Sequence, residues 1–288
     1  MTLTERRAAT RATAGPRPAP PPRAVAVGVP RLLYVLALVG LALLTLPVLA
    51  LLVRADWPGV PAAITSPEAL SALGLSLRTA LAATALCLLL GVPLAVVLAR
   101  TSTRAADVVR ALVTLPLVLP PTVGGIALLY LLGRRGLVGE QLDLLFGIRI
   151  PFTTTAVVIA QAFVALPFLV IALEGALRSA GDRYEVVAAT LGAGRWTVLR
   201  RITLPLAAPG LVSGTVLCFA RALGEFGATA LFAGNSAGVT RTMPLAIYTA
   251  FNGAGVTQDS AVALSLLLVV VAVVILVMAR AWKPGGRG

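Results

Sequence analysis

The sequence predicts an all-α, polytopic membrane protein with about six transmembrane helices. Hydrophobic residues make up 58% of the chain and charged residues only 12%, whereas soluble domains are about half apolar and about a quarter charged. Six stretches of 19 to 24 residues contain no charged residue. A helix needs about 20 mostly apolar residues to cross the hydrocarbon core of a bilayer. The alternative, buried helices of a soluble protein, is disfavoured because such helices rarely run this long without a charge.

The six uncharged stretches define the predicted spans, which cover residues 32–53, 79–99, 111–133, 150–173, 202–220 and 260–279. A helix satisfies all its backbone hydrogen bonds within one segment, so it is suited to cross lipid. The first stretch is longer than the apolar part of a cleavable secretion signal. We therefore expect it to be retained as a membrane anchor.

Basic residues are unevenly divided between alternate loops. Of the 24 Lys and Arg residues, 17 lie in the N-terminal tail, the second loop, the fourth loop and the C-terminal tail, and only five lie in the remaining loops. Because positive residues favour the cytoplasmic side, both termini of this cell-membrane protein are expected in the cytoplasm. The net charge of +13 therefore reflects topology, and no nucleic-acid partner is expected.

Residues needed for much of catalytic chemistry are missing. The chain has no histidine, which excludes Ser–His hydrolysis and His-ligated zinc. Its one lysine, Lys283, precedes Pro284, so there is no P-loop ending in Lys-Ser or Lys-Thr. Cys87 and Cys218 both lie in predicted spans and are expected to act as small apolar residues. We predict no catalytic residue, no metal site and no cofactor bound by this chain.

The third predicted span contains residues that interrupt helices. Pro120 and Pro121 are followed by Gly124 and Gly125. A proline removes a backbone donor and bends or breaks a helix. We predict a discontinuous helix that acts as a gate in the transport pathway, since broken backbone at membrane depth is tolerated where it lines a cavity or is buried in protein. A simple kink is the alternative.

Four ionisable residues lie in or beside the spans. Arg78 and Glu174 are near span ends, where a long side chain reaches the interface at low cost. Arg221 and Glu225 lie deeper and are four residues apart, so they face each other on one helix. A paired charge costs less in lipid than an isolated one. The pair either orients its helix or lies beside the transport pathway, and the sequence leaves both roles open.

The fourth loop predicts two short cytoplasmic helices. Asp182 is expected to cap a helix over 184–191, which ends at Gly192. A second helix is expected over 196–201, before Pro205 marks the return to the membrane. A basic helix pair of this kind suits docking onto a soluble partner. The alternative is an interfacial helix held on anionic lipid by its arginines.

This loop resembles that of the permease subunits of binding-protein-dependent ABC importers, where a Glu-Ala-Ala motif precedes a Gly and then Ile-x-Leu-Pro. The residues that match the motif, or stand closest to it, are Glu185, Ala188, Gly192, Ile202, Leu204 and Pro205. Position 186, where the family has Glu, holds Val. The resemblance implies that an ATPase contacts this loop, with Glu185 as a substitute for the motif's Glu.

Within that class the chain is most similar to the molybdate permeases, over residues 114–139, 219–235 and 240–251. The resemblance implies a type I, MetI-like transmembrane domain over 74–281. The remaining predicted segments are a disordered Pro-, Ala- and Arg-rich cytoplasmic tail, the first span with its external loop, and a second cytoplasmic tail, over 1–30, 31–73 and 282–288 respectively.

The resemblance also implies partners. A homodimer in membrane lipid would form the pathway, cytoplasmic ATPase subunits would use ATP and Mg²⁺, and an extracytoplasmic molybdate-binding protein would deliver the oxyanion. Sulfate, thiosulfate and tungstate are the alternative substrates. An ion-coupled secondary transporter is the alternative class. Members of that class usually have internal repeats and acidic residues near the membrane midplane, whereas Glu225 is the one deep acid here.

Overall fold

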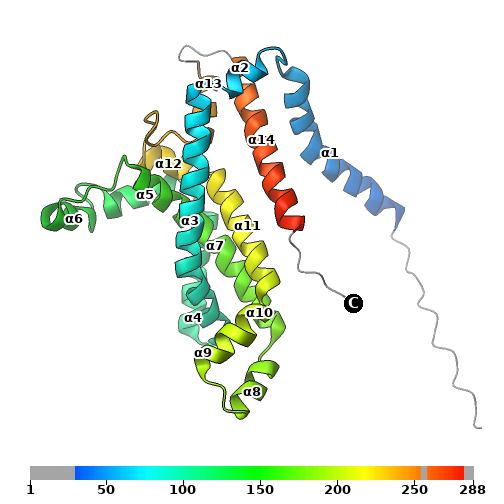
Figure 1. The fold of residues 1–288 in the computed structure, drawn as a ribbon, viewed down its shortest axis with the longest axis vertical. Coiled ribbons are helices and arrows are strands. Elements are labelled where there is room, and N and C mark those ends of the chain that lie inside the picture. The colour runs from blue at the N-terminus through cyan, green and yellow to red at the C-terminus, as the bar shows by residue number, and fades with distance from the viewer. Residues whose placement is uncertain (1–29, 254–257, 282–288) are drawn as a thin grey trace, which may run out of the picture. The chain divides into compact units, whose positions relative to one another are not determined.

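The computed structural model describes residues 30–253 and 258–281, and the regular elements in these residues are all helices (Figure 1). They are α1 (Arg31–Arg54), α2 (Val60–Ile64), α3 (Pro67–Arg100), α4 (Arg104–Val118), α5 (Pro121–Leu132), α6 (Gly139–Phe146), α7 (Thr154–Ala180), α8 (Arg183–Thr190), α9 (Arg195–Val198), η1 (Leu199–Thr203), α10 (Leu204–Leu206), α11 (Ala208–Leu223), α12 (Gly227–Phe232), α13 (Met243–Phe251) and α14 (Gln258–Ala281). Of the predicted tails over 1–30 and 282–288, residues 1–29 and 282–288 lie outside the described residues.

The apolar helices agree with the predicted number of spans. Among the described residues α1, α3, α7 and α14 are each long and apolar enough to cross a membrane. Two bent helix pairs raise the number to six when each pair counts as one span. The chain forms two compact units, Met1–Leu49 and Ala50–Gly288, and the described part of the first unit is the N-terminal portion of α1, which contains Pro47.

The helix α3 begins at a sequence signal for a helix start. The Ser66 hydroxyl accepts a hydrogen bond from the Ala69 N–H at 3.2 Å, and Pro67 lies in the first turn, where its missing N–H costs nothing. The predicted domain start at residue 74 therefore lies inside α3. Arg78, expected near a span end, also lies within this helix, on an exposed face.

The core of the second unit is built where α7 packs on both α3 and α11. A Cβ atom on Gly214 would lie 3.1 Å from Cβ of Ala172, and one on Gly210 would overlap Ala176. Small residues four positions apart allow helix backbones to approach closely in a membrane, where apolar surface alone gives no preference for protein over lipid. The glycines of α11 therefore fix its close contact with α7.

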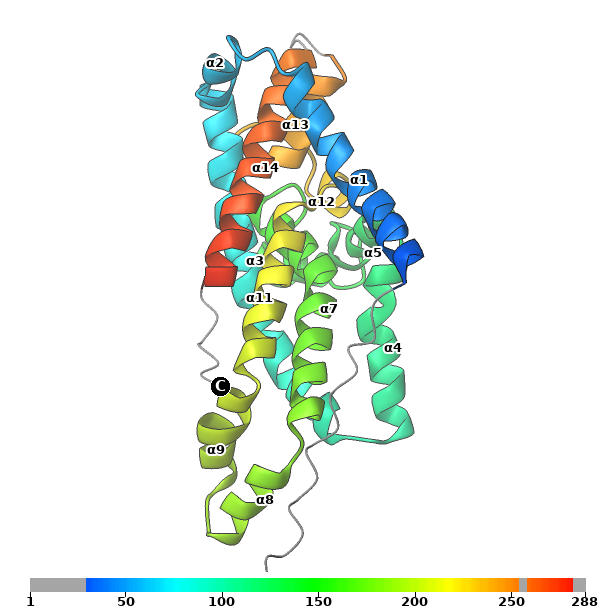
Figure 2. The same ribbon diagram turned by 90° about the vertical axis from the view of Figure 1, so that its right-hand side faces the viewer.

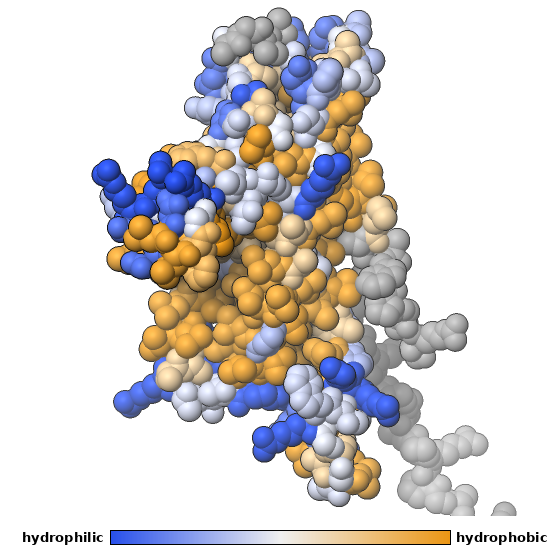
Figure 3. Space-filling model, turned by 60° about the vertical axis from the view of Figure 1, so that its left-hand side comes forward, coloured by the Kyte–Doolittle hydropathy of each residue, from blue (hydrophilic) through white to orange (hydrophobic). Residues whose placement is uncertain are grey.

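The helices α8 and α9 lie at one end of this unit, and α2 and α13 lie at the other (Figures 1 and 2). The loop after α3 and the loop after α7, which the charge distribution placed on one side of the membrane, are both at the α8 end. Figure 3 shows a broad apolar band between more polar ends on one face. This pattern fits a chain that crosses a bilayer along the direction of α3.

Two predicted spans are bent. Residues 111–133 divide into α4 and α5, which meet at 116°. Residues 202–220 include a 70° bend at Ala207, so α11 begins only at Ala208 and the residues before it belong to η1 and α10. The predicted span 202–220 therefore lies across the bend, within the helix pair that together is long and apolar enough to cross a membrane.

Candidate coupling surface and membrane pathway

The loop between α7 and α11 forms a compact helical turn. The helix α8 begins after Asp182, but the Asp182 side chain makes no capping hydrogen bond, which corrects the predicted cap. Gly192 follows the helix with a φ of +87°, and the next N–H, of Ala193, donates to the Ala188 carbonyl at 3.0 Å. The predicted second helix is divided between α9 and the π-helical turn η1. Such π-turns frequently occur at functional sites.

Large apolar side chains are exposed on this loop. The more than half-exposed residues, which we call the docking patch, are Tyr184, Val186, Val187, Leu191 and Trp196. The Arg200 guanidinium lies 5.3 Å from the ring centre of Trp196. The patch lies at the end of the unit, beyond the long apolar helices (Figures 1 and 2). Exposed apolar side chains of this kind mark an interaction surface, for a protein partner or for the membrane interface.

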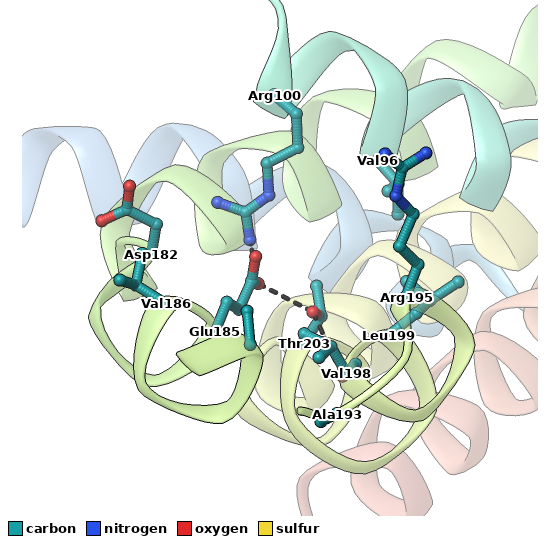
Figure 4. A pocket seen from close by; sticks show the side chains of 11 residues that line it. Val96, Arg100, Asp182, Glu185, Val186, Ala193, Arg195, Val198, Leu199 and Thr203 are labelled. Atoms are coloured by element: carbon teal, nitrogen blue, oxygen red, sulfur yellow. Dashed lines mark hydrogen bonds and ion pairs between the residues drawn. The ribbon is translucent and has the colours of Figure 1, made fainter. Parts of the chain in front are cut away.

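Glu185 lies in a cavity of about 610 Å³ between α8, η1 and the C-terminal end of α3, which Val186 of the docking patch also lines (Figure 4). Its carboxylate pairs with the Arg100 guanidinium and accepts a hydrogen bond from the Thr203 hydroxyl at 2.7 Å. The Glu185 side chain is only 19% exposed. Its carboxylate is therefore engaged inside the protein, and this geometry does not favour the expected substitution for a family Glu at the ATPase.

Sequence reasoning did not identify Arg100 or Thr203. Thr203 occupies the variable position of the Ile-x-Leu-Pro motif, between half-buried Ile202 and Leu204, and Pro205 is exposed at the start of α10. Arg100 was counted only as one of the basic residues of its loop. The only feature of the sequence that could have pointed to this contact was Thr203, a hydroxyl residue in the variable position of the matched Ile-x-Leu-Pro motif.

A second polar cluster joins α4, α7 and α3 at the same end. Arg110 donates from Nε to Glu174 at 2.8 Å and from Nη2 to the carbonyls of Leu98 and Thr101, each at 2.7 Å. Arg178 is 3.1 Å from the same Glu174 oxygen. Glu174 was expected near a span end, and it lies in the last two turns of α7, where two arginines neutralise its charge. The carbonyls at the end of α3 are thereby satisfied.

The predicted discontinuity lies between α4 and α5, and its 116° bend excludes a simple kink. The α4 helix ends at Val118, and Pro120 and Pro121 supply no N–H to continue its hydrogen bonds. Gly124 and Gly125 are both buried in α5. A Cβ atom on Gly125 would lie 2.9 Å from the Ala228 carbonyl oxygen, so the broken segment is packed against α12.

Arg221 and Glu225 form the ion pair that their spacing predicts, with Nη2 and Oε2 at 2.6 Å. The other oxygen of Glu225 accepts a hydrogen bond from the Ala228 N–H at 2.8 Å, so Glu225 also holds the first turn of α12. The Glu225 side chain is 1% exposed and that of Arg221 is 26% exposed. The guanidinium is thus the accessible member of the pair.

Comparison with known proteins identifies the family. Residues 91–284 match the family described as binding-protein-dependent transport system inner membrane component. The chain therefore belongs to this family, and it is a multi-pass membrane transport subunit, not an enzyme.

The relatives of the chain include permeases named for molybdenum. The molybdenum transport system permease protein ModB of Mycobacterium tuberculosis is 57% identical over 258 residues, which are 89% of this chain and 96% of the relative. The protein of the same name from Escherichia coli is 41% identical over 217 residues, 75% of this chain and 94% of the relative. A bacterial ABC transporter that imports alginate has a chain of the same fold, with a TM-score of 0.64 at 21% identity over 87% of this chain and 94% of that chain.

Proposed function

We propose that this chain is the membrane-spanning subunit of an ATP-driven importer and that its substrate is molybdate. The observation that carries the substrate is the 57% identity, over nearly the full length, to a relative named as a molybdenum transport permease. The alternatives are sulfate, thiosulfate and tungstate, which are also small oxyanions.

The docking patch supports a cytoplasmic ATPase as the partner. Its apolar side chains are exposed at the end of the unit where the basic loops gather, and basic loops favour the cytoplasm. With six spans, both termini would then lie in the cytoplasm. The ATPase would use ATP and Mg²⁺, since this chain has no P-loop.

The membrane site supports a role in the pathway for Arg221 and the broken helix. The break lies directly before α5, and α5 packs against α12, the helix that follows the ion pair. In a homodimer, two copies of this joined segment would line one pathway and gate it by rigid-body movement. Because Glu225 neutralises Arg221, an oxyanion would pass this point without being held tightly. An extracytoplasmic binding protein would then supply most of the selectivity.

The test is uptake of radiolabelled molybdate into proteoliposomes that contain the chain, its ATPase and its binding protein. We expect uptake that requires ATP, that tungstate inhibits and that excess sulfate leaves unchanged. An ATPase variant unable to hydrolyse ATP is the control. Uptake by the chain alone, driven by an ion gradient, would instead identify a secondary transporter. Equal uptake of sulfate would overturn the molybdate assignment.

A further inference from the structure

We infer that Glu185 is a positioning residue that fastens α8 to the C-terminal end of α3, and that it does not contact the ATPase. The inference rests on the proposed function, because α8 carries most of the docking patch. Its consequence is that movement of α8 by the motor would pass directly to a membrane-spanning helix through one ion pair.

The direction of the side chain supports this role. Successive residues of a helix are rotated by about 100°, so a Glu at position 185 cannot point where a Glu at position 186 would. Glu185 and Val186 both line the cavity, but the Glu185 carboxylate lies between Arg100 and Thr203 (Figure 4), whereas Val186 is 54% exposed. The charged side chain of α8 is therefore the one that is held inside the protein.

The partners of Glu185 come from two other elements. Arg100 is the last residue of α3, and Thr203 is the last residue of η1 and is buried. One carboxylate thus joins α3, α8 and the turn that leads into α11. Two further charged side chains, Arg195 and Asp182, line the same cavity, but no ion pair joins either of them to Glu185 among the described residues.

Apolar packing holds α8 only weakly. None of its residues is buried, and the same is true of α9. Burial of apolar side chains is the usual way in which a short helix is fixed to a protein. Where it is absent, the charge-assisted hydrogen bonds of Glu185 become the main anchor, since bonds to a charged group are about twice as strong as neutral ones.

The test measures the distance between spin labels on Ser102→Cys, just after α3, and Arg183→Cys, at the start of α8, after Cys87 and Cys218 are replaced by Ala. In the native background we expect a narrow distance distribution that is unchanged when ATP binds to the complex. Glu185→Gln should broaden the distribution while the ATPase still co-purifies. Transport per ATP hydrolysed should then fall.

Two further variants make the result decisive. The charge swap Arg100→Glu with Glu185→Arg should restore the narrow distribution. The matched control Val187→Gln changes an exposed residue of the docking patch that does not line the cavity, and it should leave the distribution narrow but reduce co-purification of the ATPase. The inference is overturned if Glu185→Gln reduces co-purification as much as Val187→Gln and leaves the label distance unchanged. The distance is also measured in the isolated chain, so it reports on Glu185 even if ATPase association, and with it the proposed function, fails.

Discussion

A Cβ atom placed on Gly227 would lie 2.8 Å from Cβ of Pro121. The turn that follows Glu225 therefore rests directly on the first residue of α5, where the α4 helix has been broken. Since Glu225 also pairs with Arg221 and holds the start of α12, a shift of the ion pair would be transmitted to the break. The ion pair, the turn after it and the break are therefore expected to move together. Substitution of the glycines at these contacts tests this expectation most directly.

The first prediction concerns Gly125. A Cβ atom there would lie 2.9 Å from the Ala228 carbonyl oxygen and 3.0 Å from its Cα, and backbone atoms cannot move aside as a flexible side chain can. We expect Gly125→Ala to lower the free energy of unfolding by about 1–3 kcal/mol, as in other overpacked cores. Thermal unfolding in detergent measures this effect, and proteoliposome uptake should fall with it.

The matched control for Gly125 is Gly175→Ala, in α7. A Cβ atom on Gly175 meets nothing within 4 Å, so the gain in helix propensity, up to about 1 kcal/mol, should dominate. The two substitutions are chemically identical and should change stability in opposite directions. An equal melting temperature for both variants would contradict the packing argument.

The second prediction separates the charge of Glu225 from its hydrogen bond to α12. Arg221→Ala should cost about 3–5 kcal/mol, because it leaves a buried carboxylate without its partner. Adding Glu225→Gln removes that charge and keeps an oxygen that can accept from the Ala228 N–H. We expect the double variant to be more stable than Arg221→Ala alone, as judged by thermal unfolding. If the double variant is the less stable one, the pair does not act by neutralisation.

The third prediction concerns Arg110. Its guanidinium reaches Glu174 and two carbonyls at the end of α3 at the same time, which a lysine ammonium cannot do with the same geometry. We expect Arg110→Lys to lower the melting temperature through the lost hydrogen bonds. Arg104→Lys, at the exposed start of the same helix, is the control and should have little effect. Similar melting temperatures for the two variants would argue against the clamp.

These residues also show what the sequence can reveal. The pairing of Arg221 with Glu225 is visible from the chain because four residues bring side chains together on any helix. Likewise, two adjacent prolines predict a break whatever surrounds them. The sizes of the bends at that break and at Ala207 are not visible, since packing against α12 and α7 decides them.

Contacts between distant segments were missed for the same reason. Arg100 and Glu185 are 85 positions apart, and Arg110 and Glu174 are 64 apart, so no local pattern pairs them. Motif matching identified the loop but could not give the surroundings of the Glu185 carboxylate, because a motif gives a position in the chain and not a side-chain direction. Asp182 similarly has the right position for a cap without the geometry.

The last prediction concerns the turn between α8 and α9. Gly192 has a φ of +87° and Gly194 a φ of −67°, and a Cβ atom on either residue would meet nothing within 4 Å. The two glycines therefore differ in backbone conformation and not in available space. We expect Gly192→Ala to strain the turn by about 1–2 kcal/mol and to lower transport per ATP hydrolysed, with membrane insertion intact. Gly194→Ala should leave coupling unchanged.

Gly192→Asn should recover part of the coupling, because Asn adopts the left-handed conformation more readily than Ala. If Asn is no better than Ala at position 192, the left-handed turn is not what coupling requires.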